Sequence, residues 1–502
     1  MKKHLAVLTI LVFLSLAAII YSWPLVFHLS SEIVDLQDGL LITWFLNWSI
    51  FHPLNYNANI FYPYSRTLAY SETMIPEAWI AAPLVFLFKE PLLAYNLNFL
   101  CGFIFTGFSV YLLARYLTKK ETAGYLAAFL FTFSTYHLNY LSHIQLFNFW
   151  PVVFTIYFWY RKNFKTFVLF FLIATLTTAL FSYFLMFFLF LCFVFYPVQR
   201  RRVLVWTLIS AIVSAPFSVP YFLVSREFHY VRPITDVIHF SLAPTDLLTQ
   251  FNPGILLVII ILGLGIFLYG RKTRDSEILF WFYGTVGSLV LALGPFLHLV
   301  KNTVHVGPVP GIPLPYLVFY YLLPGFSGFR TPSRWMLLFG FFLTMTLVYV
   351  LKEHLSKRVT VFLLLLLSLG LLVPLKFYPV PKVADFPPEQ KWLATHYFGA
   401  PLIQFPIYSW NNEPEVELET LREYYSTIHW HPMVNGYSGF SPKEWENRVS
   451  WLQKNFPSVE TISYLRNLGV KLVLVPVSWQ GEMRAFNLNI VANFPKTLVY
   501  QL

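Results

Sequence analysis

The sequence predicts a polytopic α-helical membrane protein with about 11 transmembrane helices, followed by a small α/β domain outside the membrane. Composition is the first reason: 57% of the 502 residues are apolar, 12% are charged, and the mean hydropathy is +0.59. Such a chain has too little polar surface for a soluble globular protein. The second reason is that long apolar stretches alternate with short basic groups. The third is that hydropathy falls after Lys376, where several prolines mark a linker.

Six short basic groups separate the apolar stretches, and they predict the topology. Cationic residues are retained on the cytoplasmic side of a bilayer, so we expect each interval between two groups to hold an even number of spans. The N-terminus is then cytoplasmic and the C-terminus extracytoplasmic. The same retention explains the formal net charge of +11 without a nucleic-acid partner. The groups are Lys2/Lys3, Arg115/Lys119/Lys120, Arg161/Lys162/Lys165, Arg200/Arg201/Arg202, Arg271/Lys272/Arg274 and Lys352/Lys357/Arg358.

A helix needs about 20 apolar residues to cross a hydrocarbon core of about 30 Å. The first apolar run is longer than a secretory h-region, so we interpret it as an uncleaved first span. Residues 166–198 allow two interpretations, one long tilted helix or two short spans with a turn near Ser182, and the orientation rule favours two. The predicted spans are 5–29, 91–114, 121–138, 144–160, 166–181, 183–198, 203–224, 254–270, 276–299, 334–351 and 359–375.

These spans make residues 1–375 the transmembrane domain, with a long first outer loop at 30–90. That loop contains two apolar segments, Leu40–Ile50 and Ala78–Phe88, which are too short to span a bilayer. We expect both to be helices that lie in the membrane interface.

Residues 376–502 predict the extracytoplasmic α/β domain. Two apolar runs, Ala400–Ile407 and Val470–Val477, are typical of strands, and Pro442–Lys454 between them is typical of a helix.

Acidic residues open the first outer loop: Glu32, Asp35 and Asp38 follow the first span directly. Carboxylates near a membrane are costly, so the cluster calls for an explanation. Either Asp35 or Asp38 can be a general base, or a ligand of a divalent cation such as Mg or Mn. The structural alternative is that Asp38 caps a helix that begins at Gly39, while Asp35 is solvated.

Two arginines, Arg330 and Arg334, stand four residues apart where the tenth predicted span begins. Guanidinium groups at a helix N-terminus form an anion site, which favours binding of a lipid phosphate. The alternative is that both side chains snorkel to the interface and orient the helix.

The short turn between the third and fourth predicted spans contains His137, His143 and Gln145. These side chains can position a sugar or orient a carboxylate, or they simply cap two helix ends. Glu72 and Glu77 of the first loop are candidate second acids, although an isolated Glu is more often solvated.

The layout of the whole chain resembles the GT-C superfamily of integral-membrane glycosyltransferases, which includes protein mannosyltransferases and oligosaccharyltransferases. The resemblance implies a polyprenyl-phosphate sugar donor, transfer on the outer face, and an acidic base or metal ligand at Asp35 or Asp38. An adjacent Asp-Glu pair and a Trp-Trp-Asp segment are both missing, so neither of those two acceptors is implied. The segments that resemble uncharacterised bacterial members are His137-Leu-Asn-Tyr-Leu-Ser-His143-Ile-Gln145, Gly328-Phe-Arg330-Thr-Pro-Ser-Arg334 and Asn435-Gly-Tyr-Ser-Gly-Phe440, beside the acidic Glu32-Ile-Val-Asp35-Leu-Gln-Asp38.

We therefore expect an inverting glycosyltransferase in a prokaryotic plasma membrane, with Asp35 as base, Arg330 and Arg334 at the leaving phosphate, and His143 positioning the sugar. Its expected partners are membrane lipids, a lipid-linked sugar donor, and a glycan, lipid or protein acceptor. The alternatives are a transporter or flippase for lipid-linked sugars, an O-antigen ligase or polymerase, and an inactive scaffold. Spans nearly free of charge disfavour the transporter. A ligase or polymerase is expected to concentrate basic residues in a late outer loop.

Overall fold

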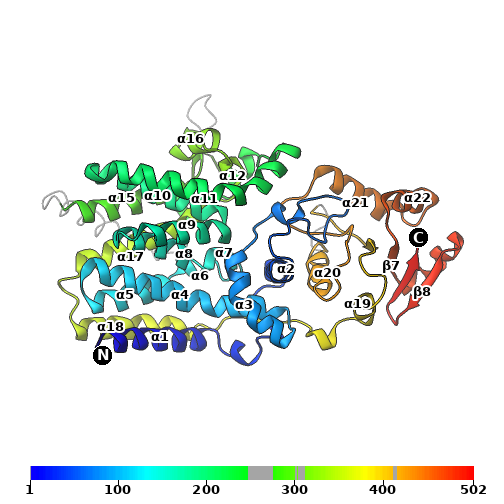
Figure 1. The fold of residues 1–502 in the computed structure, drawn as a ribbon, viewed down its shortest axis with the longest axis horizontal. Coiled ribbons are helices and arrows are strands. Elements are labelled where there is room, and N and C mark those ends of the chain that lie inside the picture. Colours follow the sequence, from blue (N-terminus) through cyan, green and yellow to red (C-terminus); the bar gives the residue numbers. More distant parts are fainter. Residues whose placement is uncertain (1, 247–274, 300–301, 304–310, 411–414) are drawn as a thin grey trace. The chain divides into compact units, whose positions relative to one another are not determined.

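The computed structural model describes residues 2–246, 275–299, 302–303, 311–410 and 415–502, and it is mostly helical (Figure 1). The chain forms two compact units. Unit 1 consists of Met1–Tyr21, Leu100–Leu141 and Leu146–Pro374, and unit 2 consists of Ser22–Phe99, Ser142–Gln145 and Leu375–Leu502. The first outer loop therefore folds with the C-terminal region.

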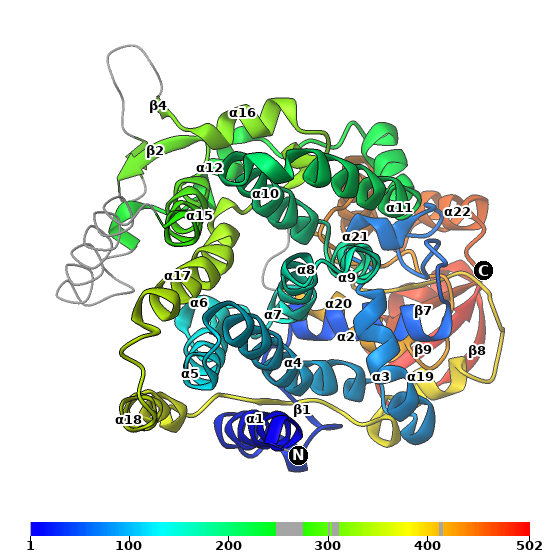
Figure 2. The same ribbon diagram turned by 60° about the vertical axis from the view of Figure 1, so that its left-hand side comes forward.

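Unit 1 is built from apolar helices (Figures 1 and 2). Its helices are α1 (Lys2–Tyr21), α4 (Leu92–Thr118, whose first turns belong to unit 2), α5 (Glu121–Thr132), α6 (Thr135–Leu138), α7 (Ile144–Phe147, which begins in unit 2), α8 (Trp150–Tyr160), α9 (Phe164–Thr177), α10 (Ala179–Phe195), α11 (Arg200–Glu227), α12 (Ile234–His239), α15 (Ser276–Ala292), α16 (Pro315–Leu322), α17 (Trp335–Leu351) and α18 (Lys357–Ser368). Short strands β2 (Phe296–Leu299), β3 (Asn302–Thr303) and β4 (Ile312–Pro313) pair in the order β3-β2-β4.

Three helical segments in the described residues are long and apolar enough to cross a membrane: Leu92–Thr118, Pro197–Glu227 and Pro332–Leu351. The second is mostly exposed, and Leu208 and Ile212 of α11 leave 61% and 63% of their surface uncovered. Large apolar side chains exposed along one helix favour contact with lipid over contact with water.

Close helix contacts in unit 1 depend on small residues. Gly284 of α15 packs against Phe342 of α17, and a Cβ at position 284 would lie only 2.3 Å from the Phe342 ring. One turn away, the hydroxyls of Thr285 and Thr346 lie 3.3 Å apart. Small and hydroxyl residues at such contacts are typical of membrane helix packing.

Residues 166–198 form two helices, α9 and α10, so the single long helix is excluded. The break is at Thr178 and not near Ser182. Thr178 has an extended backbone, and its hydroxyl accepts a hydrogen bond from the backbone N–H of Leu180, which starts α10.

Several predicted spans have other bounds in the structure. The first helix ends at Tyr21, before position 29, and the predicted helix at 276–299 ends at Ala292 and continues into strand β2. The stretches 121–138 and 144–160 are each divided into two helices. The predicted span 254–270 lies outside the described residues.

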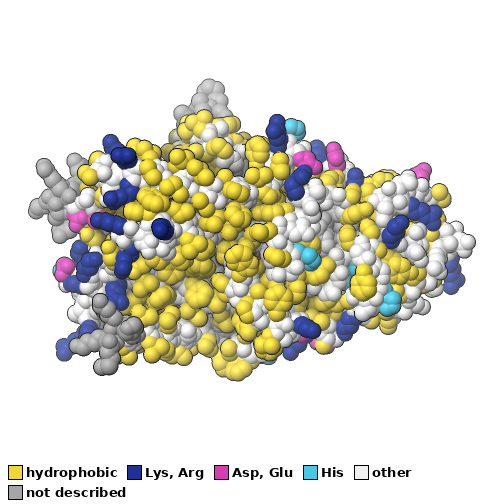
Figure 3. Space-filling view, viewed as in Figure 1, with side chains coloured by type: hydrophobic (Ala, Val, Ile, Leu, Met, Phe, Trp, Pro, Cys, Tyr) yellow, Lys and Arg dark blue, Asp and Glu magenta, His cyan; other side chains and the backbone are white. Residues whose placement is uncertain are grey.

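Four of the six basic groups lie together at one end of unit 1. The Lys120 ammonium is 2.7 Å from the Glu353 carboxylate, which joins the second group to the last. The Arg161 guanidinium lies 5.6 Å from the Tyr116 ring centre, and Arg202 lies 5.4 Å from that of Phe164. Figure 3 shows that hydrophobic side chains cover the helices of unit 1, while many of its Lys and Arg side chains gather at one end of the unit.

Unit 2 is an α/β unit. Its main sheet has the order β6-β7-β9-β8, in which β6 and β7 are parallel and the other pairs antiparallel. The predicted strands at 400–407 and 470–477 correspond to the shorter strands β6 and β7, and the predicted helix at 442–454 corresponds to α21. The elements of the unit are β1 (Glu32–Ile33), α2 (Asp38–Phe51), α3 (Ile75–Phe88), β5 (Tyr378–Pro379), α19 (Pro388–Leu393), β6 (Leu402–Gln404), α20 (Glu417–Ser426), α21 (Lys443–Asn455), α22 (Val459–Leu468), β7 (Leu472–Pro476), α23 (Gln480–Met483), β8 (Asn489–Asn493) and β9 (Thr497–Gln501).

Helix α2 is the buried centre of this unit, so the prediction that 40–50 forms an interfacial helix is wrong. All residues from Gly39 to Ile50 are buried, and α2 packs against α3 and α20. Asn59 joins α2 to α20, because it accepts a hydrogen bond from the Trp44 indole and donates one to Ser426. Helix α3 differs: its Trp79, Leu87 and Phe88 are exposed, as an interfacial helix requires.

Candidate functional site

Asp35 shapes the turn that precedes α2. Its Oδ1 atom accepts hydrogen bonds from the backbone N–H groups of Gln37, at 2.9 Å, and Gly39, at 3.3 Å. Free N–H groups at a helix start are satisfied in this way by short acidic side chains. The alternative that Asp35 is merely solvated is therefore wrong. Asp38 lies within α2, as its first residue, and not before it.

Asp38 lies in the first turn of α2 and pairs with His143. Its Oδ2 atom is 3.3 Å from His143 Nε2, and the two side chains are 39% and 30% exposed. The positive end of the α2 dipole favours the ionised carboxylate at this position. The Asp38–His143 pair is therefore a charged, partly accessible site on a buried helix.

The partners of His143 indicate how its ring is oriented. His143 Nδ1 lies 3.0 Å from the Ser142 hydroxyl. The backbone carbonyl of Ser142 accepts a hydrogen bond from the Tyr95 hydroxyl at 3.4 Å. A neutral imidazole has one N–H and one lone pair. With Nε2–H facing the carboxylate, Nδ1 accepts the Ser142 proton, so both ring nitrogens are satisfied. A carboxylate held by an imidazole in this way can act as a general base.

His137 and Gln145 contribute differently from His143. The His137 ring is buried, with its nitrogens 2.8 Å and 2.7 Å from the carbonyl oxygens of Thr132 and Phe147. His137 has no ring nitrogen left for a sugar hydroxyl. We therefore assign it a structural role, in which its ring links its own turn to α7. Gln145, at the start of α7, is 7% exposed and is likewise remote from solvent.

The two candidate second acids also differ from each other. Glu77 is fully buried in the first turn of α3, and its backbone carbonyl accepts a hydrogen bond from Asn98. A large acceptor cannot reach a carboxylate at such a depth. Glu72 lies in the irregular chain before α3 and is partly exposed.

Arg330 and Arg334 of unit 1 belong to a cluster with Arg232, which we call the arginine cluster. Burial lowers the pKa of Arg330, and the charges of Arg232 and Arg334 lower it further. The Arg330 guanidinium stacks 4.4 Å from the Phe240 ring centre. Within the described ranges, neither Arg330 nor Arg334 forms an ion pair with a carboxylate. The Asp236 charge acts on Arg330 in the opposite direction, but it ranks below burial and the two arginine charges. Three gathered positive charges are typical of an anion site.

The expected helical spacing of the two arginines is wrong. Arg330 lies in irregular chain, and Arg334 ends the 3-10 turn Pro332–Arg334 that precedes α17. The cluster forms because Arg232 approaches from another segment: its backbone N–H donates to Ser327 at 3.0 Å. From its place in an outer loop, the sequence alone makes Arg232 a weaker candidate for the same anion site.

One oxygen of each acidic residue already has a partner within the protein, and the role of Mg or Mn ligand stays a prediction for both. Asp35 Oδ1 is engaged by two backbone N–H groups, and Asp38 Oδ2 is paired with an imidazole. Among the described residues, no three His, Cys, Asp or Glu side chains are arranged to hold a metal ion.

The structure thus combines a bundle of membrane-length apolar helices with an α/β unit that contains an acid–imidazole pair. No protein-family model matches the sequence, and no curated protein matches it. Among solved structures, the oligosaccharyltransferase AglB of Archaeoglobus fulgidus, in complex with an inhibitory peptide and a dolichol-phosphate, is similar with a TM-score of 0.46. The identity is 13% over 95% of this chain and 70% of that chain, and the apo form of the same enzyme gives the same values.

A second similar structure is ArnT from Cupriavidus metallidurans bound to undecaprenyl phosphate. Its TM-score is 0.41, with 12% identity over 98% of this chain and 97% of that chain. TM-scores below 0.5 do not transfer an activity, so the functional case rests on the residues of the site.

Proposed function

We propose that this chain is an integral-membrane glycosyltransferase that moves a sugar from a polyprenyl-phosphate donor to an acceptor on the outer face of a prokaryotic plasma membrane. The Asp38–His143 pair carries the proposal, because it joins an accessible carboxylate to an imidazole at a helix start. Three membrane-length apolar segments support a lipid-linked donor, and the arginine cluster supports a phosphate in that donor.

In the proposed reaction, an acceptor hydroxyl attacks the anomeric carbon and transfers its proton to the Asp38 carboxylate. The new C–O bond forms as the bond to the phosphate oxygen breaks, and polyprenyl phosphate leaves with that electron pair. A single displacement inverts the anomeric centre. His143 orients Asp38 through its Nε2–H, and general base catalysis of this kind contributes about 10²–10⁴-fold.

The leaving phosphate needs positive charge, and we assign the arginine cluster of unit 1 to it. Guanidinium groups match phosphate oxygens in charge and geometry. The partial burial of Arg330 strengthens its attraction for an anion, because screening by water is reduced. Arg330→Gln should therefore lower kcat/KM for the donor by about 10-fold or more. Arg201→Gln, in a basic group outside the cluster, is the matched control and should leave kcat/KM unchanged.

The test of the base assignment is a double-mutant cycle on the Asp38–His143 pair. Asp38→Asn should lower kcat by about 10²-fold or more, and His143→Gln by less. Because the two groups act as a unit, the double variant should be little worse than Asp38→Asn alone. Full transfer activity in Asp38→Asn would remove Asp38 from the reaction.

A further inference from the structure

Tyr437 contacts the residue that lies between the two acids of the site. Its hydroxyl accepts a hydrogen bond from Gln37 Nε2 at 3.0 Å. Gln37 immediately precedes α2, and its own backbone N–H donates to Asp35. A side chain 400 residues later in the chain therefore holds the turn from Asp35 to Asp38.

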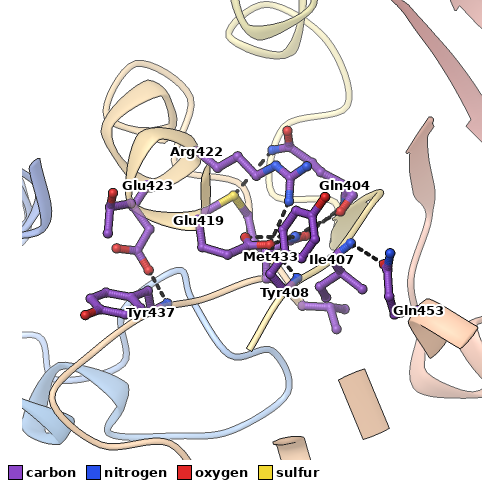
Figure 4. Close-up of polar contacts among 12 residues, drawn as sticks. Gln404, Ile407, Tyr408, Glu419, Arg422, Glu423, Met433, Tyr437 and Gln453 are labelled. Carbon is purple, nitrogen blue, oxygen red and sulfur yellow. Dashed lines mark hydrogen bonds and ion pairs between the residues drawn. The ribbon is translucent and has the colours of Figure 1, made fainter. Parts of the chain in front are cut away.

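Tyr437 is itself held by two neighbours. Its backbone N–H donates to Glu423 Oε1 at 2.5 Å (Figure 4). Its ring packs on Trp410, with ring centres 4.6 Å apart. Tyr437 is 4% exposed and Glu423 is fully buried. The hydroxyl of Tyr437 thus points to Gln37 from a fixed backbone.

Glu423 shares the buried face of α20 with Glu419, and the two acids have unequal partners. Glu419 accepts hydrogen bonds from the Tyr408 backbone at 2.9 Å and from Arg422 at 2.7 Å (Figure 4). It also accepts one from Asn435 at 3.0 Å. Glu423 Oε2 is buried and has no hydrogen-bond partner among the residues that the structure describes.

The hydrogen-bond partners of Glu419 and Glu423 indicate that one of the two acids is protonated. A buried carboxylate is stable only when its oxygens are paired, which holds for Glu419 and not for Glu423. Burial raises the pKa of Glu423 well above its ordinary value, and the Glu419 charge raises it further. Glu423 is therefore a neutral acid that serves Tyr437 as a carbonyl-type acceptor.

We propose that Tyr437 is a positioning residue for the Asp38–His143 pair, held in place by protonated Glu423 and acting through Gln37. This inference rests on the proposed function and adds to it the elements that align the base. Loss of the Tyr437 hydroxyl frees Gln37 and loosens the turn, so Asp38 spends less time within hydrogen-bond distance of His143. A small misplacement of a catalytic group can cost about 10²-fold in rate.

The test compares kcat and KM for transfer from a labelled polyprenyl-phosphate sugar. Tyr437→Phe keeps the ring and removes only the hydroxyl, so kcat should fall about 10-fold or more while KM for the donor stays within about twofold. Gln37→Met, at a partly exposed position, should give the same result without disturbing the core. Tyr500→Phe is the matched control, because its buried hydroxyl has no hydrogen-bond partner among the described residues.

The Glu423 variants separate positioning from general stability. Glu423→Gln retains an uncharged acceptor for the Tyr437 N–H and should keep kcat within about twofold of wild type, whereas Glu423→Leu should resemble Tyr437→Phe. Unchanged kcat in both Tyr437→Phe and Gln37→Met would overturn the inference, as would a loss in Glu423→Gln equal to that in Glu423→Leu.

A readout that needs no activity distinguishes this inference from the proposed function. Diethyl pyrocarbonate modifies neutral imidazoles, and its rate at His143, followed by mass spectrometry, reports how the Asp38–His143 pair is held. Tyr437→Phe should change that rate at least about twofold, and Tyr500→Phe should not. If the wild type transfers no sugar, the proposed function fails, while an altered His143 rate still supports the positioning. An unaltered rate in Tyr437→Phe contradicts the positioning itself.

Discussion

Asp35 and Asp38 lie three residues apart and perform different tasks. The Asp35 carboxylate accepts two backbone N–H groups at the start of α2, whereas Asp38 faces His143. The sequence favoured Asp35 as the base, because spacing alone cannot distinguish a capping carboxylate from a reactive one. The structure supplies that distinction through hydrogen-bond partners.

The first prediction at this scale concerns stability. Asp35→Ala removes the two backbone contacts at the start of α2, so it should lower the free energy of unfolding by about 0.5–2 kcal/mol. Asp38→Asn should change it by less than about 0.5 kcal/mol, because Asp38 is partly exposed. Thermal unfolding in detergent measures both. Equal losses for Asp35→Ala and Asp38→Asn would contradict the division of roles.

A second prediction is that protonation of Glu423 makes the stability of the protein depend on pH. The folded protein keeps the Glu423 proton at pH values where the unfolded chain, with a pKa near the ordinary 4.5, has lost it. The native state then binds more protons, so stability falls as pH rises above 4.5. Glu423→Gln removes this loss, so its Tm should exceed the wild-type Tm at pH 7 and approach it at pH 4. A difference that does not depend on pH would show that Glu423 is ionised in the folded protein.

Helix α2 is the element on which the site depends, and a glycine fixes its approach to β1. A Cβ at Gly39 would lie 2.8 Å from Ile33 Cδ1 and 3.6 Å from Asp35 Cβ. Gly39→Ala should therefore displace the Ile33 side chain and cost about 1 kcal/mol of stability. Gly481→Ala in the same unit is the control, because a Cβ there meets no atom within 4 Å. A thermal shift no larger for Gly39→Ala than for Gly481→Ala would contradict the tight contact.

The elements also show what sequence can and cannot predict. Strands β6 and β7, helix α21 and the division of 166–198 follow from local apolar patterns and charge, and all were predicted. The burial of α2 was not predicted, because an apolar helix of this length has the same sequence pattern whether it packs against lipid or against protein. Its partner α20 lies more than 360 residues later. Gln37, Glu423 and the contact with Tyr437 were missed for the same reason, since one sequence does not reveal long-range pairs.

At the scale of the whole molecule, the basic groups give a prediction about orientation. In a background with Cys101 and Cys192 replaced by Ser, a cysteine is introduced as Phe398→Cys, at a position that is 78% exposed in unit 2. A second variant, Arg201→Cys, lies in a basic group. An impermeant maleimide should label the first in intact cells and the second only after permeabilisation. The opposite pattern would reverse the topology and move unit 2 to the cytoplasm.

The central claim is that the chain transfers sugar from a polyprenyl-phosphate donor with Asp38 as base. The most direct measurement incubates the purified protein in lipid with a panel of radiolabelled polyprenyl-phosphate sugars and with cell-envelope acceptors. The wild type should release polyprenyl phosphate and label an acceptor with at least one donor, and Asp38→Asn should reduce that labelling about 10²-fold. Failure of the wild type with every donor, or full activity in Asp38→Asn, would contradict the claim.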